Sequence, residues 1–160
     1  MKTVASVRDC DELSLLRYDT LKPYAVAFIF TTMVFLALDF VWLGFVAKDF
    51  YRTQIGALML EKPLLGVAFT FYLLYVIGIV YFAVMPALET DSWVRAMTSG
   101  ALLGLIAYAT YDLTNLATLR GWSVKLSMMN TAWGTFVTSI AATAEYFGTR
   151  SFPGITAKIL

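Results

Sequence analysis

Two uninterrupted apolar stretches constrain this chain more than any other feature of its sequence. The first, residues 23–46, reads PYAVAFIFTTMVFLALDFVWLGFV, and the second, residues 64–88, reads LLGVAFTFYLLYVIGIVYFAVMPAL. A helix needs about 20 mostly apolar residues to cross the hydrocarbon core of a bilayer. Each stretch exceeds that length and starts beside a proline, a residue that the first turn of a helix tolerates well. Both stretches are therefore predicted to be transmembrane helices.

The composition places the whole chain in the same class. Hydrophobic residues make up 59% of the 160 residues and charged residues only 14%, whereas about 25% of the residues in a soluble domain are charged. Two further segments, at about 94–119 and 130–148, are long enough to span but less purely apolar. We expect an all-α fold, an integral membrane four-helix bundle with these four spans.

Three regions follow from this interpretation. Residues 1–22 are predicted to form a polar N-terminal tail, residues 23–148 the four-span transmembrane domain, and residues 149–160 a C-terminal tail. The first tail lacks the order of segments found in a secretory signal, and its acidic residues argue against a mitochondrial transit peptide. A bacterial inner membrane is the location that we favour, with an organellar inner membrane as the alternative.

The connection between the first two spans is predicted to contain a short interfacial helix. Helical spacing places Tyr51, Ile55 and Met59 on one apolar face, while Lys48 and Arg52 can reach lipid headgroups. Such a helix would lie along the membrane surface and cover one end of the bundle.

Charge and residue usage exclude several classes of function. The net charge is +1 and the basic residues are scattered, so we expect no nucleic-acid partner. Cys10 is the single cysteine and histidine is absent, which rules out an internal disulfide and removes the commonest ligands of zinc, haem and non-haem iron. We therefore expect neither a metal nor a cofactor.

Two aspartates interrupt the apolar spans at similar depth. Asp39 lies beyond the middle of the first span and Asp112 beyond the middle of the third, at about 6 and 9 Å from the bilayer centre at 1.5 Å per residue. The first and third spans run in the same direction, so both carboxylates are expected in one half of the membrane. Tyr72, Asn130 and Trp133 fall in the same half. A carboxylate at this depth costs roughly 2.5–3.5 kcal/mol unless it faces the protein interior.

Spacing indicates which way Asp112 faces. Gly100, Gly104, Tyr108 and Asp112 follow one another at intervals of four residues, and small residues with that spacing let helices approach closely in lipid. This face should therefore point into the bundle. The expected partner is a hydroxyl-bearing face of the fourth span, made of Thr131, Thr135, Ser139 and Thr143.

These residues define a candidate polar or ligand-binding cluster near the first and third connections. Its predicted members are Asp39, Trp42, Tyr108, Tyr111, Asp112, Asn115, Arg120 and Trp133. The partner of Asp112 is left open between Asn115, Arg120, Lys48 and a proton shared with Asp39. A purely structural role, in which the carboxylates hold helices together, stands beside the ligand-binding interpretation.

Four segments also carry a resemblance to a known family. LDFVWLGFVAKDFYRTQIG, KPLLGVAFTFYLLYVIGIVYF, YATYDLTNLATLRGW and TAWGT resemble a family of small four-span membrane proteins, found mainly in bacteria and classed as a domain of unknown function. The resemblance covers roughly residues 23–148. It implies the fold and a site, and the positions that match are Asp39, Trp42, Tyr51, Tyr111, Asp112, Asn115, Thr118, Arg120, Trp122 and Trp133.

Three hypotheses about function follow. The one that we favour is non-catalytic: binding of a small amphiphile, or an accessory or structural role in a membrane complex, because no activated nucleophile accompanies the polar and aromatic residues. The second is an enzyme of membrane-lipid or isoprenoid metabolism that uses Asp39 or Asp112 as acid or base. The third is a small transporter, which would need to dimerise. The expected partners are membrane lipids, other subunits of a membrane complex, or a second copy of the chain.

Overall fold

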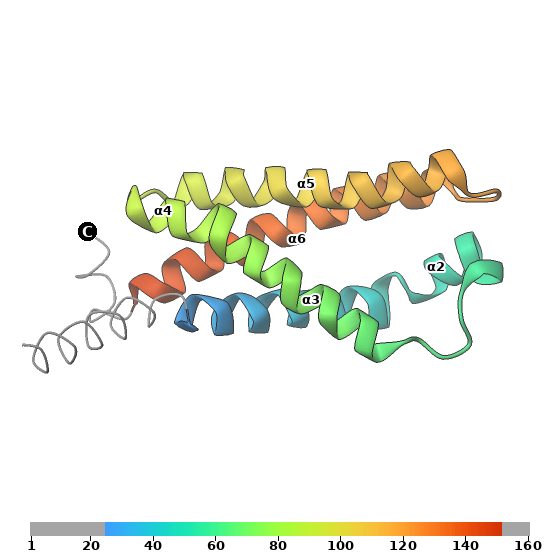
Figure 1. The fold of residues 1–160 in the computed structure, drawn as a ribbon, viewed down its shortest axis with the longest axis horizontal. Helices are drawn as coiled ribbons and strands as arrows, with labels where there is room; N and C mark the ends of the chain where they lie inside the picture. Colours follow the sequence, from blue (N-terminus) through green and yellow to red (C-terminus); the bar gives the residue numbers. More distant parts are fainter. Residues whose placement is uncertain (1–24, 152–160) are drawn as a thin grey trace, which may run out of the picture.

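The structure is a computed structural model that describes residues 25–151, and within that range it is helical with no strand. The all-α prediction is therefore confirmed. The first long helix spans Ala25–Val46 and ends in the π-helical turn η1. The elements in chain order are η1 (Trp42–Val46), α2 (Lys48–Ile55), η2 (Gly56–Leu58), α3 (Leu65–Ile79), η3 (Val80–Val84), α4 (Met85–Glu89), α5 (Trp93–Thr118) and α6 (Val124–Arg150) (Figure 1).

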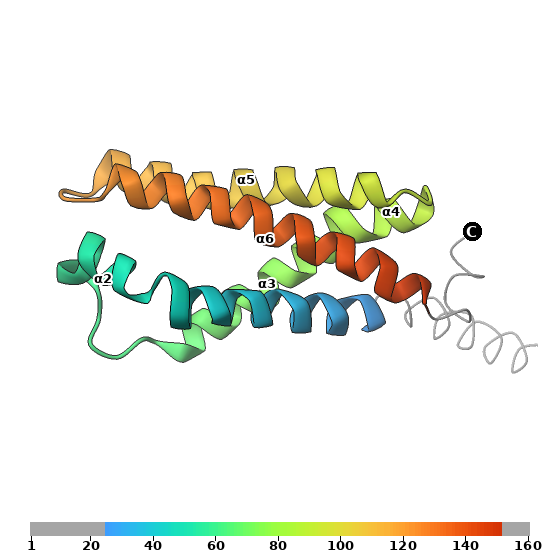
Figure 2. The same cartoon turned by 180° about the vertical axis from the view of Figure 1, so that it is seen from behind.

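The long helices alternate in direction, as their short connections require. Residues 25 and 151 lie at the same end of the molecule as the turn between α4 and α5 (Figures 1 and 2). The short helix α2 and the connection between α5 and α6 lie at the opposite end. The predicted helix in the first connection is thus present, and it sits beside the end of the α5–α6 pair.

Two helices, Ala25–Val46 and Leu65–Glu89, are long and apolar enough to cross a membrane. Helices α5 and α6 are longer, at 26 and 27 residues, but they fall short in apolar content. Their glycine, serine, threonine and asparagine residues account for this difference. Many of those residues are buried in the α5–α6 contact, where small and polar side chains allow close packing.

Glycines bring α5 and α6 into close contact. A Cβ atom added at Gly104 would lie 2.3 Å from the Gly134 carbonyl oxygen, and one added at Gly100 would lie 2.9 Å from the Thr138 oxygen. Gly134 in turn packs against the ring of Tyr108. A Cβ atom added at Gly134 would lie 2.0 Å from the nearest atom of that ring. The face of α5 predicted from its spacing therefore packs on α6.

The opposing face of α6 differs from the predicted one. Thr131 and Ser139 do reach α5, the latter by donating to the Met97 carbonyl at 3.0 Å. Thr135 and Thr143 instead donate to carbonyls of their own helix, a common habit of threonine within helices. The contact face is formed by the smaller and more buried residues Gly134, Thr138 and Ala142.

A π-helical turn in the second long helix was not expected from the sequence. In η3 the amide of Met85 donates to the Val80 carbonyl, five residues earlier. Pro86 follows at the start of α4, and a proline within a helix has no amide hydrogen and clashes with the carbonyl four residues before it. The wider turn accommodates the proline, so the helix continues to Glu89.

Helix α6 begins about six residues earlier than predicted, at Val124. The reason is Ser123, whose hydroxyl accepts a hydrogen bond from the Leu126 amide at 3.2 Å and so caps the helix. Ser123 also donates to the Gln54 side chain of α2, which ties the two connections at this end together.

Replacing Ser123 with alanine should lower the free energy of unfolding by about 1 kcal/mol, the usual effect of losing a helix cap, with a further loss from the Gln54 contact. Ser92 provides the matched control, because it caps α5 through the Arg95 amide at 3.3 Å and no hydrogen bond in the described residues joins its side chain to another helix. Denaturant titrations in detergent micelles would compare the two variants. Equal losses would show that the Gln54 contact contributes nothing.

Candidate functional site

Asp112 is fully buried at the contact between α5 and α6. Its Oδ2 atom accepts hydrogen bonds from the Asn130 side-chain amide at 3.0 Å and from the Thr131 hydroxyl at 3.2 Å. Its Oδ1 atom has no partner within residues 25–151. Both donors come from the first two turns of α6.

Asn130 also forms a hydrogen bond with the short helix α2. Its side-chain oxygen accepts a hydrogen bond of 2.5 Å from the Tyr51 hydroxyl. A carboxylate can only accept, so the Asn130 amide nitrogen must face Asp112, and its oxygen then faces Tyr51. Burial raises the pKa of the Tyr51 hydroxyl to about 12, which keeps its proton in place at neutral pH. The chain Asp112–Asn130–Tyr51 therefore has one fixed polarity.

Asp39 has a separate set of donors. Its carboxylate accepts hydrogen bonds from the Tyr72 hydroxyl and, at 3.2 Å, from the Trp133 indole nitrogen. The Trp133 ring stacks on Trp42, with ring centres 4.3 Å apart and planes 7° from parallel. These contacts join the first long helix to α3 and to α6.

The structure brings together only part of the predicted cluster. Asp39 and Asp112 are both buried, yet no hydrogen bond joins them within the described residues. Asn115 is half-buried and Arg120 is exposed, and neither donates to Asp112 in the part of the chain that the structure describes. Asn115 lies about one turn further along α5 than Asp112. The position beside the carboxylate is occupied by Asn130 of α6. Arg120 follows the end of α5 at Thr118.

A small cavity lies beside Asn130 and Tyr51. We call it the inner cavity; it has a volume of about 320 Å³, and its walls come from α2, α3, α5 and α6. Two residues of the predicted site, Tyr108 and Tyr111, line it, and the full lining is Tyr51, Phe71, Ala107, Tyr108, Tyr111 and Asn130. Aromatic rings therefore form most of the wall, and the hydrogen-bonded pair Tyr51–Asn130 supplies its polar part.

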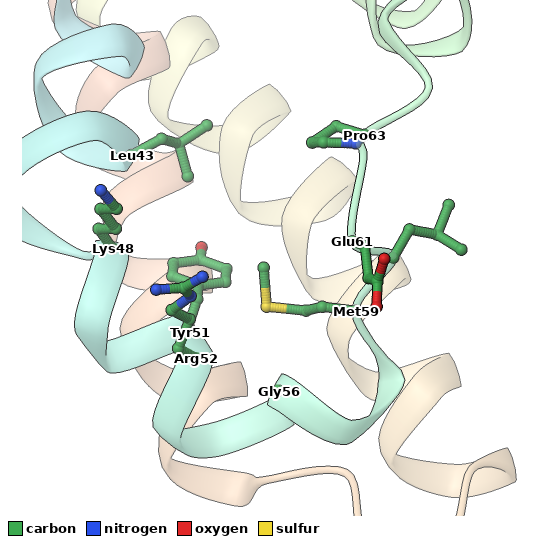
Figure 3. A pocket seen from close by; sticks show the side chains of 9 residues that line it. Leu43, Lys48, Tyr51, Arg52, Gly56, Met59, Glu61 and Pro63 are labelled. Carbon is green, nitrogen blue, oxygen red and sulfur yellow. The ribbon is translucent and has the colours of Figure 1, made fainter.

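A larger cavity adjoins α2. We call it the outer cavity; it has a volume of about 690 Å³ and lies between α2 and the chain that leads to α3 (Figure 3). Its lining consists of Leu43, Lys48, Tyr51, Arg52, Gly56, Met59, Leu60, Glu61 and Pro63. Tyr51 lines both cavities, so the two adjoin at this side chain.

Several residues of this site were absent from the predicted cluster. Tyr72 and Asn130 were expected in the same half of the bundle as the two carboxylates, but they were not assigned to the cluster. Tyr51 was assigned to the apolar face of the interfacial helix, although its hydroxyl is the group that reaches Asn130. Depth along the spans was the signal that could have found Tyr72 and Asn130, whose side chains donate to the two carboxylates.

Sequence reasoning also missed a third buried carboxylate, Glu145, near the other end of α6. One of its oxygens accepts a hydrogen bond from Thr149, and the other has no partner in the described residues. At the same end, Asp91 accepts a hydrogen bond of 2.7 Å from Tyr146 and pairs with Arg150. The contacts of Asp91 join the end of α6 to the turn before α5.

Within residues 25–151 there is no group of three histidine, cysteine, aspartate or glutamate residues that could hold a metal ion. The two carboxylates of the candidate site are instead surrounded by neutral donors, which are tyrosine, tryptophan, asparagine and threonine side chains. Such a set of donors can hold carboxylates in place and orient a neighbouring polar group.

Comparison with known proteins places the chain in a family. Its sequence matches the family DUF2177, described as a predicted membrane protein, over residues 24–147. No curated protein matches the chain, and no solved structure does. The match covers most of the sequence and includes the whole site described above. The chain therefore belongs to the DUF2177 family of predicted membrane proteins.

Proposed function

We propose that this membrane protein is a four-span bundle that binds a small amphiphile in the inner cavity without transforming it. Membrane lipids are the partners that this proposal implies. The observation that carries it is the hydrogen-bonded chain Asp112–Asn130–Tyr51, which ends at the residue shared by the inner and outer cavities.

The surfaces of α5 and α6 support the four-span topology. Most of their exposed large side chains are apolar, and these include Leu102, Leu105, Ile106, Leu113, Met128, Phe136, Ile140 and Phe147. Proteins that work in water rarely expose contiguous apolar patches of more than a few hundred Å². Helices with small and polar residues between them and apolar residues outside suit a bundle in lipid.

The size and lining of the inner cavity support an amphiphilic ligand. Small-molecule sites usually have volumes of about 300–1,000 Å³ and combine apolar walls with a few placed polar groups. The inner cavity lies at the lower end of that range, with Phe71, Tyr108 and Tyr111 as aromatic wall and Asn130 as a polar contact. An alkyl chain or a small ring fits such a wall, and a polar head fits the larger space beside Tyr51.

The fixed polarity of the site favours binding over catalysis. Asn130 stands between Asp112 and Tyr51, and its amide group must keep one orientation to serve both. A proton cannot pass along a chain that is interrupted by an amide held in this way. The carboxylate therefore positions Asn130 and Tyr51 as parts of a binding surface.

Filling the inner cavity should abolish binding. We expect Ala107→Phe to weaken the binding of a lysophospholipid tenfold or more, because the new ring occupies the space that Ala107 leaves open. Native mass spectrometry of the protein in detergent, titrated with the lysophospholipid, measures this. The control is Ala117→Phe, since Ala117 is exposed further along α5. Equal affinities for the two variants would contradict the proposal.

A second candidate, an enzyme of membrane-lipid metabolism, is favoured by one observation: the Oδ1 atom of Asp112 has no partner in the described residues. An acid or base needs such a free oxygen, but Asp112 is fully buried, so a substrate would have to displace Asn130 or Thr131 first. Lipid profiles of a deletion strain and of a strain carrying Asp112→Asn test this role. Unchanged lipid and quinone profiles in both strains would exclude it.

A further inference from the structure

Charges of opposite sign face each other across the outer cavity. Lys48 and Arg52 stand on α2, and Glu61 lies on the chain segment opposite, with Tyr51 and Met59 between them (Figure 3). No ion pair within residues 25–151 involves any of these three charged side chains. Each charge is thus available to a molecule that enters the cavity.

The spacing along α2 places the side chains of Lys48 and Arg52 next to each other. Lys48 and Arg52 are four residues apart, so they project from the same face of the helix. Two basic side chains on one face form a site for a phosphate group, to which the arginine can donate two parallel hydrogen bonds. Glu61 cannot take part in that contact, and it would repel a second negative charge.

The cavity therefore matches a headgroup that carries both signs of charge. A phosphate beside Lys48 and Arg52 leaves Glu61 to accept hydrogen bonds from an ammonium group a few atoms away. A headgroup that carries only a negative charge would pair with Lys48 and Arg52 of α2, but it would leave Glu61 beside an anion. An uncharged headgroup would satisfy none of the three.

The outer cavity shares one lining residue with the inner one. Tyr51 belongs to both, and Leu43 and Met59 add apolar wall on the outer side. One molecule can therefore place its charged head in the outer cavity and the beginning of its apolar chain against the aromatic rings of the inner cavity.

We propose that the ligand is a membrane phospholipid with a phosphoethanolamine headgroup, its phosphate held by Lys48 and Arg52 and its ammonium by Glu61. This inference rests on the proposed function, since it names the head of the amphiphile whose chain occupies the inner cavity. The choice of a primary ammonium follows from Glu61, whose carboxylate can accept hydrogen bonds that a fully methylated amine could not donate.

The test compares lysophospholipids of one acyl chain that differ only in headgroup, titrated into the full-length protein and followed by native mass spectrometry. We expect the phosphoethanolamine form to bind at least fivefold more tightly than the phosphoglycerol form. Glu61→Gln should bring that ratio to about one, and the double variant Lys48→Gln/Arg52→Gln should weaken both lipids about tenfold. The controls are Lys62→Gln and Asp49→Asn, neighbouring charges that do not line the cavity. Both should retain the wild-type ratio.

The outcomes separate this inference from the proposed function. If both lysophospholipids bind equally to the wild type and Ala107→Phe still weakens both, the headgroup assignment is overturned and the inner cavity stands. If Glu61→Gln removes the preference while Ala107→Phe has no effect, the headgroup site stands and the inner cavity is not where the chain binds. Absence of binding by every lysophospholipid would overturn both. A thermal unfolding curve for each variant shows that it is folded.

Discussion

Replacing Asp112 with alanine is expected to lower the free energy of unfolding by about 1–3 kcal/mol, because it leaves the buried Asn130 amide without an acceptor. Thr131 loses an acceptor as well, although a threonine in a helix can donate to its own backbone instead. Asn130 would then be free to turn, so Tyr51 would lose its fixed partner. Denaturant titrations in detergent micelles measure the loss of stability, and lysophospholipid binding should weaken in parallel.

Asp112→Asn separates the hydrogen bonds from the charge. An amide oxygen in place of Oδ2 can still accept from Asn130 and Thr131, and the new amino group would take the place of Oδ1, which has no partner in the described residues. We expect this variant to lose less than about 1 kcal/mol. A loss as large as that of the alanine variant would show that the negative charge itself is needed, and the structural interpretation of Asp112 would then be wrong. Asp49→Ala, on the exposed side of α2, is the control.

Gly104→Ala is expected to be at least as damaging, with a loss of about 3 kcal/mol. Its Cβ would lie 2.3 Å from the Gly134 carbonyl oxygen, which is backbone and cannot turn aside. The two helices would have to separate, and overpacking of this kind usually costs about 1–3 kcal/mol. The separation would also disturb Asp112, two turns further along the same face of α5.

The control for this prediction is Gly78→Ala in α3, where an added Cβ meets nothing within 4 Å. Alanine favours helix over glycine by roughly 0.5–1 kcal/mol, so this variant should be neutral or slightly stabilised. Thermal unfolding in detergent compares the two substitutions directly. A Gly104→Ala protein as stable as the Gly78→Ala protein would contradict the close contact of α5 and α6.

Much of the fold could be predicted because apolar length is a strong signal. The two apolar stretches became the helices Ala25–Val46 and Leu65–Glu89, and the ends of these helices at Val46, Leu65 and Glu89 lie within one residue of the predicted bounds. The π-helical turn η3 could not be predicted, since Pro86 is equally compatible with a kink, a break or a widened turn. The choice depends on how the helix packs, and Val80, Ala83 and Val84 are buried there.

The candidate site was harder to predict. Periodicity shows on which face of a helix a residue lies, but not which residue of another helix it contacts. Asp112 is buried, as its spacing indicated, but its hydrogen-bond donors are none of the candidates left open, which were Asn115, Arg120, Lys48 and Asp39. The donors come from another helix, α6, and spacing within α5 cannot identify them. The contribution of Tyr51 depends on the direction in which α2 leaves the first helix, and the sequence alone does not contain that direction.

The contacts of Asp39 also bear on how the protein is made. Its two hydrogen-bond donors, Tyr72 and Trp133, lie 33 and 94 residues further along the chain. A ribosome therefore delivers the first helix to the membrane with an unpartnered carboxylate, and it completes the pair of donors only when α6 emerges. The hydrogen bonds of Asp39 are thus complete only after the last helix has been synthesised.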